Sequence, residues 1–260
     1  MRGFFSQSYY TYKGLFMWLN WPGFISSIFL SPIASVLMYN LIWRFNTGAR
    51  TTDYVIGIIV YMMSFPCFDG IAQSYAYDRT FGTLPFVFAT NTSRVVNYLA
   101  RGVLHYPSAI VAFALGLITA CLTNDIVLAP ANWGLVVLAV LIIAFSIVGF
   151  SQILGIISVI TRNWVSVQYL SLGILMVFCG AVIPLSAYPR FIGALGHIFP
   201  ITHGLTAVRE ALSGGSFAAV RTDILYELIV GIGYSIAAYV AFRFFESHVR
   251  RTGSLQQESQ

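Results

Sequence analysis

Residues 134–160 read GLVVLAVLIIAFSIVGFSQILGIISVI, and this stretch decides the fold class of the chain. Its 27 residues include no Asp, Glu, Lys or Arg. A helix of about 20 apolar residues is long enough to cross the hydrocarbon core of a bilayer. The stretch therefore predicts a membrane-spanning helix.

The composition of the whole chain agrees with a membrane protein. Of the 260 residues, 58% are hydrophobic and only 9% are charged, whereas a soluble domain has about 25% charged residues. The net charge of +5 comes from basic residues scattered along the chain. This argues against a nucleic-acid-binding patch and fits the bias of membrane proteins toward cytoplasmic Arg and Lys. The three cysteines are widely spaced in or beside apolar runs, and we expect small buried side chains there.

Six stretches are long and apolar enough to span a membrane, so the sequence predicts an all-α fold of six transmembrane helices. Polar segments separate them. The expected spans, which together form a transmembrane domain over residues 22–246, are residues 22–43, 54–76, 97–122, 134–160, 165–184 and 224–246.

The distribution of basic residues predicts which ends of these helices face the cytoplasm. With both termini in the cytoplasm, nine Arg and Lys residues lie on the cytoplasmic side and five on the outer side. Because cytoplasmic loops of membrane proteins are enriched in Arg and Lys, this count favours cytoplasmic termini. It places the 77–96 loop and a tail at 247–260 in the cytoplasm, and the 185–222 loop outside.

The residues before the first expected span form an amphipathic pattern. Apolar residues recur there at spacings of four and three, on one face of a helix: Phe5, Tyr9, Tyr12, Phe16 and Leu19. Such a helix over residues 1–21 is expected to lie in the headgroup plane of the membrane. The alternative is a helix packed on the rest of the protein.

The 77–96 loop begins with YDRTFGTLPFVFATNTSR, a polar interruption between two apolar spans. Thr83 is suited to cap a short helix with Pro85 in its first turn. The apolar residues that would then share one face are Phe81, Leu84 and Phe88. Such a helix is suited to insert into a groove of a partner protein. The alternative is a loop that lies against the membrane.

The 185–222 loop contains FPITHGLTAVREALSGG at residues 199–215, which predicts a second short helix. Thr202 is placed to cap its N-terminus and Gly214 to end it. Its apolar stripe consists of Leu205, Val208 and Leu212. Because about a dozen residues cannot cross a bilayer, the helix is either re-entrant, shielded by protein or a water-filled cavity, or an ordinary surface helix.

Polar side chains within the expected spans are few. Ser146 and Gln152 in the fourth span either line a transport path or form hydrogen bonds between helices. Asp69 is expected near the inner surface, and Asp223 and Glu227 near the outer end of the last span. Because an ionisable group at mid-membrane marks an ion or proton route, these positions argue against a proton-driven carrier.

Two of these segments resemble segments of type-2 ABC exporter permeases. The first cytoplasmic loop of that family commonly reads R-x-x-G-T-L-E, and Pro85 stands here in place of the acidic residue. The family also carries a Pro followed about nine residues later by an Arg before the last span, which Pro200 and Arg209 match. The residues in register with the loop motif are Arg79, Gly82, Thr83 and Leu84. The order of interfacial helix, spans, loop and outer helices extends the resemblance over essentially the whole chain.

The resemblance implies a function for the chain. It would be one of two permease subunits, identical or related, that flank a path through the plasma membrane of a prokaryote and carry a drug-like or amphiphilic substrate outward. A separate ATP-binding subunit would press on the loop around Phe81–Phe88. The outer helix near Pro200–Gly214 would gate the path, with Arg209 holding it through a salt bridge to Glu210 or to a partner loop.

The chain itself has no sequence motif for ATP hydrolysis or other catalysis. A phosphate-binding loop G-x-x-x-x-G-K-[ST] is absent, and the single lysine is Lys13. HExxH and GxSxG are absent too, and the histidines have no metal-ligand spacing; His197 and His203 are expected on different helix faces. We therefore predict a transporter subunit without its own cofactor or metal, whose ATP and Mg²⁺ bind to the partner. The alternatives are an exporter of lipid-linked glycans, disfavoured because the N-terminal segment lacks a basic run, and an ion-coupled secondary carrier.

Overall fold

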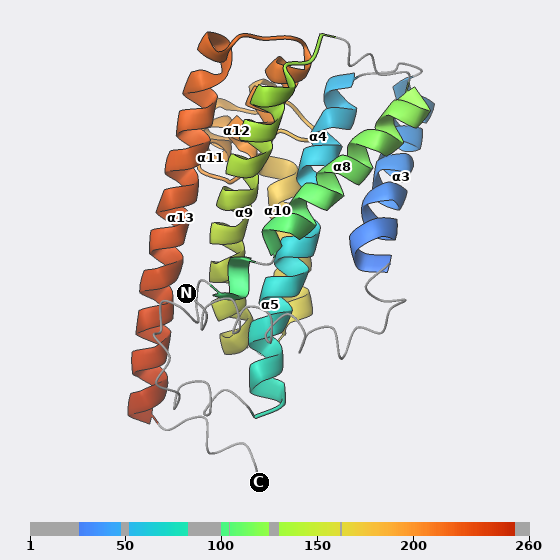
Figure 1. Ribbon diagram of the computed structural model, residues 1–260. Helices are drawn as coiled ribbons and strands as arrows, with labels where there is room; N and C mark the ends of the chain where they lie inside the picture. Colours follow the sequence, from blue (N-terminus) through green and yellow to red (C-terminus); the bar gives the residue numbers. More distant parts are fainter. Residues whose placement is uncertain are drawn as a thin grey trace.

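The computed structural model of this chain describes residues 26–47, 52–82, 100–103, 105–124, 130–161 and 163–252. Within these ranges the chain is helical with short connections and contains no strand (Figure 1). The helices are α3 (Ser31–Thr47, after the π-helical turn Ser26–Leu30), α4 (Thr52–Met62), α5 (Ser64–Thr80), α8 (His105–Asn124), α9 (Trp133–Thr161), α10 (Trp164–Phe178), the 3-10 turn Leu185–Ala187, α11 (Arg190–Gly196), α12 (Thr202–Leu212) and α13 (Phe217–Thr252). The prediction of an all-α membrane protein is confirmed.

Some of the expected features lie outside the described residues. These are the interfacial helix at 1–21, most of the 77–96 loop with Thr83, Leu84 and Phe88, and the end of the tail from residue 253.

Five helical segments of the described chain are long and apolar enough to cross a membrane: Ile28–Asn46, Thr52–Thr80, Ala100–Thr123, Trp133–Thr161 and Phe217–Ser247. They correspond to five of the six expected spans. The remaining one, 165–184, is represented by the 15-residue helix α10, which is about 22 Å long and so shorter than a hydrocarbon core of about 30 Å. The count of six spans stays a prediction.

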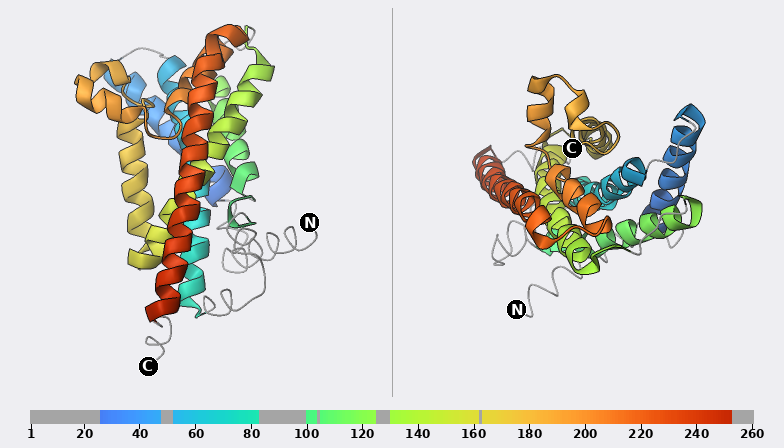
Figure 2. Two further views of the ribbon diagram at one scale, coloured as in Figure 1. Left: turned by 90° about the vertical axis from the view of Figure 1, so that its left-hand side faces the viewer. Right: turned by 90° about the horizontal axis from the view of Figure 1, so that it is seen from above.

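Helix α9 lies at the centre of the bundle. It packs against α5, α8, α10, α12 and α13, whereas α3 packs on α4 and α8. Seen from above, α3 and α13 are on opposite sides of the molecule (Figure 2). The short helices α11 and α12 lie at one end of the bundle, and the last turns of α5 and α13 lie at the other (Figures 1 and 2). The chain therefore places its two candidate functional segments at opposite ends.

The second span bends between α4 and α5, where the helix is interrupted at Met63. Pro66 accounts for the position of this break. A proline has no N–H for the carbonyl four residues earlier, and its ring clashes with that carbonyl, which here belongs to Met62. The bend lets α4 pack beside α12 while α5 packs along α9.

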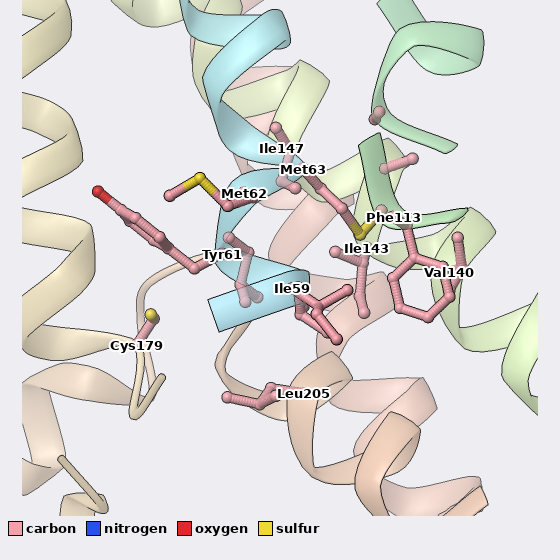
Figure 3. Packing of buried hydrophobic residues seen from close by; sticks show 14 of the residues in the cluster. Ile59, Tyr61, Met62, Met63, Phe113, Val140, Ile143, Ile147, Cys179 and Leu205 are labelled. Carbon is pink, nitrogen blue, oxygen red and sulfur yellow. The ribbon is translucent and has the colours of Figure 1, made fainter. Parts of the chain in front are cut away.

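One part of the buried core lies between α4, α8, α9 and α12 (Figure 3). Its side chains are almost completely excluded from the surface: Ile59, Met63, Phe113, Val140, Ile143, Ile147 and Leu205. In a bilayer, lipid is as apolar as these side chains, so close packing rather than transfer from water stabilises such contacts. A Cβ atom at Gly204 would lie 2.2 Å from Ile143 Cγ1, so this contact requires glycine. Close packing thus seats α12 against the centre of the bundle.

Candidate functional sites

The end of α5 is set by the residues that resemble the exporter loop motif. The Phe81 N–H donates to the Tyr77 carbonyl over 2.8 Å, and the Gly82 N–H donates to Arg79 O over 3.0 Å. Gly82 has φ +66°, which glycine adopts without the steric penalty of a side chain. Arg79 donates from Nη1 to Val159 O at the end of α9, and the Phe81 side chain is 53% exposed. The motif glycine therefore ends the helix, and the motif arginine ties this end to α9.

A partly buried ion pair joins the two sides of the 77–96 loop at its base. Asp78 lies in the last turn of α5, where the loop begins, and Arg101 follows the loop; their side chains form a salt bridge while being only 22% and 5% exposed, respectively. Arg101 also donates from Nη1 to Ser74 O over 3.0 Å. Its guanidinium lies 4.5 Å from the centre of the Tyr75 ring. The helix end before the loop and the turn after it are thus held together.

Tyr75 connects this ion pair to α9. Its hydroxyl donates to Gln152 Oε1 over 3.0 Å, and both residues are buried. The ring packs closely on α9 because Gly155 leaves room for it; a Cβ there would lie 2.4 Å from Tyr75 Cδ2. Gln152 therefore forms a hydrogen bond between helices, one of the two roles expected for it; the other role, lining a transport path, stays a prediction.

Helix α12 is packed on three long helices at the other end of the bundle, namely α4, α9 and α13. Its expected apolar stripe is confirmed, because Leu205, Val208 and Leu212 are each at most 6% exposed. The expected cap is wrong. The N-cap position is Ile201, which forms no side-chain cap, while Thr202 is the first helical residue and donates to Gly196 O over 2.8 Å. This bond instead fixes the turn that joins α11 to α12.

The N-terminus of α12 is bound by Glu227 of α13. Glu227 Oε1 accepts from Ile201 N over 2.8 Å, and Oε2 accepts from Gly204 N over 3.0 Å. The hydroxyl of Ser146 in α9 also donates to Oε1. Glu227 is 0% exposed and lies ten residues into α13. The sequence predicted a carboxylate near the outer end of the span but not its contact with α12. Through this contact Ser146, like Gln152, forms a hydrogen bond between helices.

Arg209 joins α12 to two other segments. It donates to Asp53 O at the start of α4 from Nε over 3.1 Å and from Nη2 over 2.8 Å. Nη2 also lies 3.4 Å from Gly180 O, after α10. Burial lowers the pKa of this guanidinium, and the charge of Asp53 partly offsets the effect. In the described part of the chain Arg209 thus bonds to backbone carbonyls and not to Glu210, and the alternative, a salt bridge to a partner loop, stays a prediction.

His197 and His203 come together, contrary to the expectation that they lie on different faces of one helix. The chain turns between α11 and α12, so the rings of His197 and His203 lie 5.1 Å apart between their centres. His203 Nδ1 lies 3.4 Å from Asp223 Oδ1, and its ring stacks on Tyr226. Among the described residues there is no group of three or more His, Cys, Asp or Glu side chains able to hold a metal ion.

Helix α10 is tied to the second span by polar contacts. The side chain of Gln168, 2% exposed, lies close to that of Asp69. The hydroxyl of Tyr61 donates to Leu172 O over 3.0 Å. Asp69 therefore has a polar neighbour within the chain, which sequence spacing alone did not reveal.

This architecture defines a multi-pass helical membrane protein with a clamped loop at one end and a short packed helix at the other. A protein-family model described as ABC-2 type transporter matches residues 11–213, more than three quarters of the chain. The chain belongs to this family, which confirms the resemblance seen in its sequence. It is thus a membrane-spanning permease component of the ABC type, a class that is not itself catalytic and generally works with an ATP-binding subunit. Comparison with curated proteins gave no match.

Proposed function

We propose that the chain is the permease subunit of an exporter that carries an amphiphilic substrate out of the cell, driven by a separate ATP-binding subunit. The family match carries this proposal. The substrate class rests on the N-terminal segment, where residues 1–21 contain only Arg2 and Lys13 as basic residues. That segment lacks the basic run associated with exporters of lipid-linked glycans.

The geometry supports a route for motion from the loop to the outer helix. Force on the 77–96 loop acts on both of its ends at once, because the salt bridge from Asp78 to Arg101 joins them. The bonds of Tyr75 to Gln152 and of Arg79 to Val159 then carry the displacement into α9. Helix α9 has 29 residues and so extends over about 43 Å. It packs against α12 at its other end, so a tilt of α9 displaces the outer helix.

An ion-coupled carrier is the competing function, and the carboxylates of the half-buried Asp69 and the buried Glu227 are the observation that favours it. Intramembrane carboxylates often mark ion routes. Here Glu227 accepts two backbone N–H bonds and a hydroxyl bond, and Asp69 lies close to the polar side chain of Gln168. These partners support a structural role. Collapse of the proton gradient at constant ATP should leave export by the exporter intact and abolish export by a carrier.

The docking of the ATP-binding subunit can be tested by co-purification. Leu84→Asp and Phe88→Asp each place a charge on the expected apolar face of the loop, so each should abolish recovery of the ATP-binding subunit with the chain. Membrane insertion, measured by fluorescence of a C-terminal reporter, should stay unchanged. Thr90→Asp is the matched control, because helical spacing puts it opposite Phe81, and it should leave recovery unchanged. Unchanged recovery with both apolar-face variants would remove the docking proposal.

A further inference from the structure

Helix α12 starts without any cap from its own sequence. Ile201 occupies the N-cap with φ +82° and makes no side-chain cap. A β-branched residue adopts this conformation only where its surroundings enforce it. The first N–H groups of a helix also need acceptors, and the buried position of this turn keeps water away from them. A partner from elsewhere in the chain must therefore hold this helix start.

Glu227 is that partner. It lies 26 residues after Ile201 and reaches the helix start from α13. Its two oxygens accept from different amides, Ile201 N and Gly204 N, so the carboxylate bridges the first turn. A negative charge at a helix N-terminus is also favoured by the helix dipole. The contact combines the geometry of a side-chain cap with the strength of charge-assisted hydrogen bonds.

The same carboxylate connects a third helix. The hydroxyl of Ser146, in the middle of α9, donates to it, and Ser146 is 0% exposed. Around this point α9 and α13 pack closely, since a Cβ at Gly231 would lie 3.1 Å from Ser146 Cα. The helices α9, α12 and α13 thus meet at one buried group.

We propose that Glu227 is a positioning residue that makes α12 move as one body with α9 and α13, so that the outer helix is displaced by these helices and does not loosen on its own. The assignment of α12 as a gate rests on the proposed exporter function. The attachment itself rests only on the contacts of Glu227, so the two can be tested separately.

The decisive variant is Glu227→Gln, which keeps the shape and changes the hydrogen bonding. A carboxylate accepts from all three donors, whereas the amide has one acceptor oxygen and an NH₂ group that faces a donor. Ser146→Ala is the milder variant, because it removes one bond and leaves both backbone contacts. Arg221→Gln is the matched control: it removes one charge from an exposed position of the same helix.

The first measurement is amide hydrogen exchange of residues 198–208 in the purified chain in nanodiscs. Glu227→Gln should speed exchange of this segment at least tenfold and leave α10 unchanged, because the NH₂ group replaces one carboxylate oxygen and faces a backbone N–H of the first turn, which loses its acceptor. Ser146→Ala should have a smaller effect that does not add to that of Glu227→Gln, and Arg221→Gln should have none. Exchange in Glu227→Gln within twofold of that in the original chain would overturn the attachment. If Glu227→Gln does not fold, Glu227→Asp, whose shorter side chain cannot reach both amides, takes its place with the same criterion.

The second measurement follows the motion of α12 in the complex with its ATP-binding subunit. Thr206, exposed on α12, is replaced by Cys in a Cys121→Ala background, and labelling by a membrane-impermeant maleimide is compared with and without ATP and vanadate. The nucleotide-dependent change in labelling should be present in the original chain and at least fivefold smaller in Glu227→Gln. An equal change in both overturns the positioning role. If labelling of the original chain does not depend on nucleotide, the result counts against α12 as a gate. The hydrogen-exchange measurement alone then tests whether Glu227 attaches α12 to α9 and α13.

Discussion

The ion pair at the base of the 77–96 loop yields a prediction whose size follows from its surroundings. Breaking a buried pair costs about 3–5 kcal/mol. Asp78→Asn should cost less, about 2 kcal/mol, because Arg101 keeps its bond to Ser74 O and its contact with Tyr75. Arg101→Gln removes those contacts as well and should cost about 3–4 kcal/mol, of which the cation–π contact supplies about 1 kcal/mol.

A double-mutant cycle separates the pair from these other contacts. If the two side chains act together, the double variant should be destabilised by about 1.5–3 kcal/mol less than the sum of the single variants. The free energy of unfolding is measured for all four chains by titration with SDS in mixed micelles, followed by tryptophan fluorescence. Arg101→Gln combined with Glu210→Gln, at the other end of the bundle, provides the additive control. If the losses of unfolding free energy in the Asp78 and Arg101 variants add to within about 0.5 kcal/mol, the salt bridge does not hold the two loop ends together.

Two further predictions concern the outer helix. Arg209→Ala removes the bonds to Asp53 O and Gly180 O. The complex should assemble but lose at least 80% of its nucleotide-dependent change in α12 labelling, and Arg209→Lys should retain part of that change. A full change in Arg209→Ala would count against the role of Arg209 in holding α12. Gly204→Ala places a methyl group against Ile143 and should lower the free energy of unfolding by about 1–3 kcal/mol. Gly233→Ala, which has open space around it, should leave the free energy of unfolding unchanged. Equal stability of the two variants would show that α12 does not pack closely on α9.

The sequence was sufficient for features that depend on local composition. The apolar run at 134–160 became α9, and the apolar stripe of Leu205, Val208 and Leu212 became the buried face of α12. The end of the fifth apolar stretch was less predictable. Because the residues after Phe178 remain apolar, hydropathy predicted a span that extends to residue 184. The helix instead ends at Phe178, and Gly180 adopts φ +74°. Hydropathy reports the environment of a residue and not its backbone conformation.

The spacing of residues along the sequence could not predict contacts between segments that are far apart in the chain. The pair of Asp78 and Arg101 spans the whole loop, and Glu227 meets a helix start 26 residues earlier. A carboxylate inside an apolar span and a helix start without a good cap were both visible, but nothing in one sequence joins them. The histidines were placed on different faces because one continuous helix was assumed, and the turn between α11 and α12 changes that geometry.

The central claim is that the chain receives its driving force through the 77–96 loop from an ATP-binding protein. A photo-crosslinking amino acid at Phe88 in growing cells tests it directly, with the adduct identified by mass spectrometry. The account predicts an adduct with a protein that carries a phosphate-binding loop, and no such adduct when the crosslinker is placed at Thr90. Adducts with lipid alone, or crosslinking only to proteins on the outer side of the membrane, would contradict it.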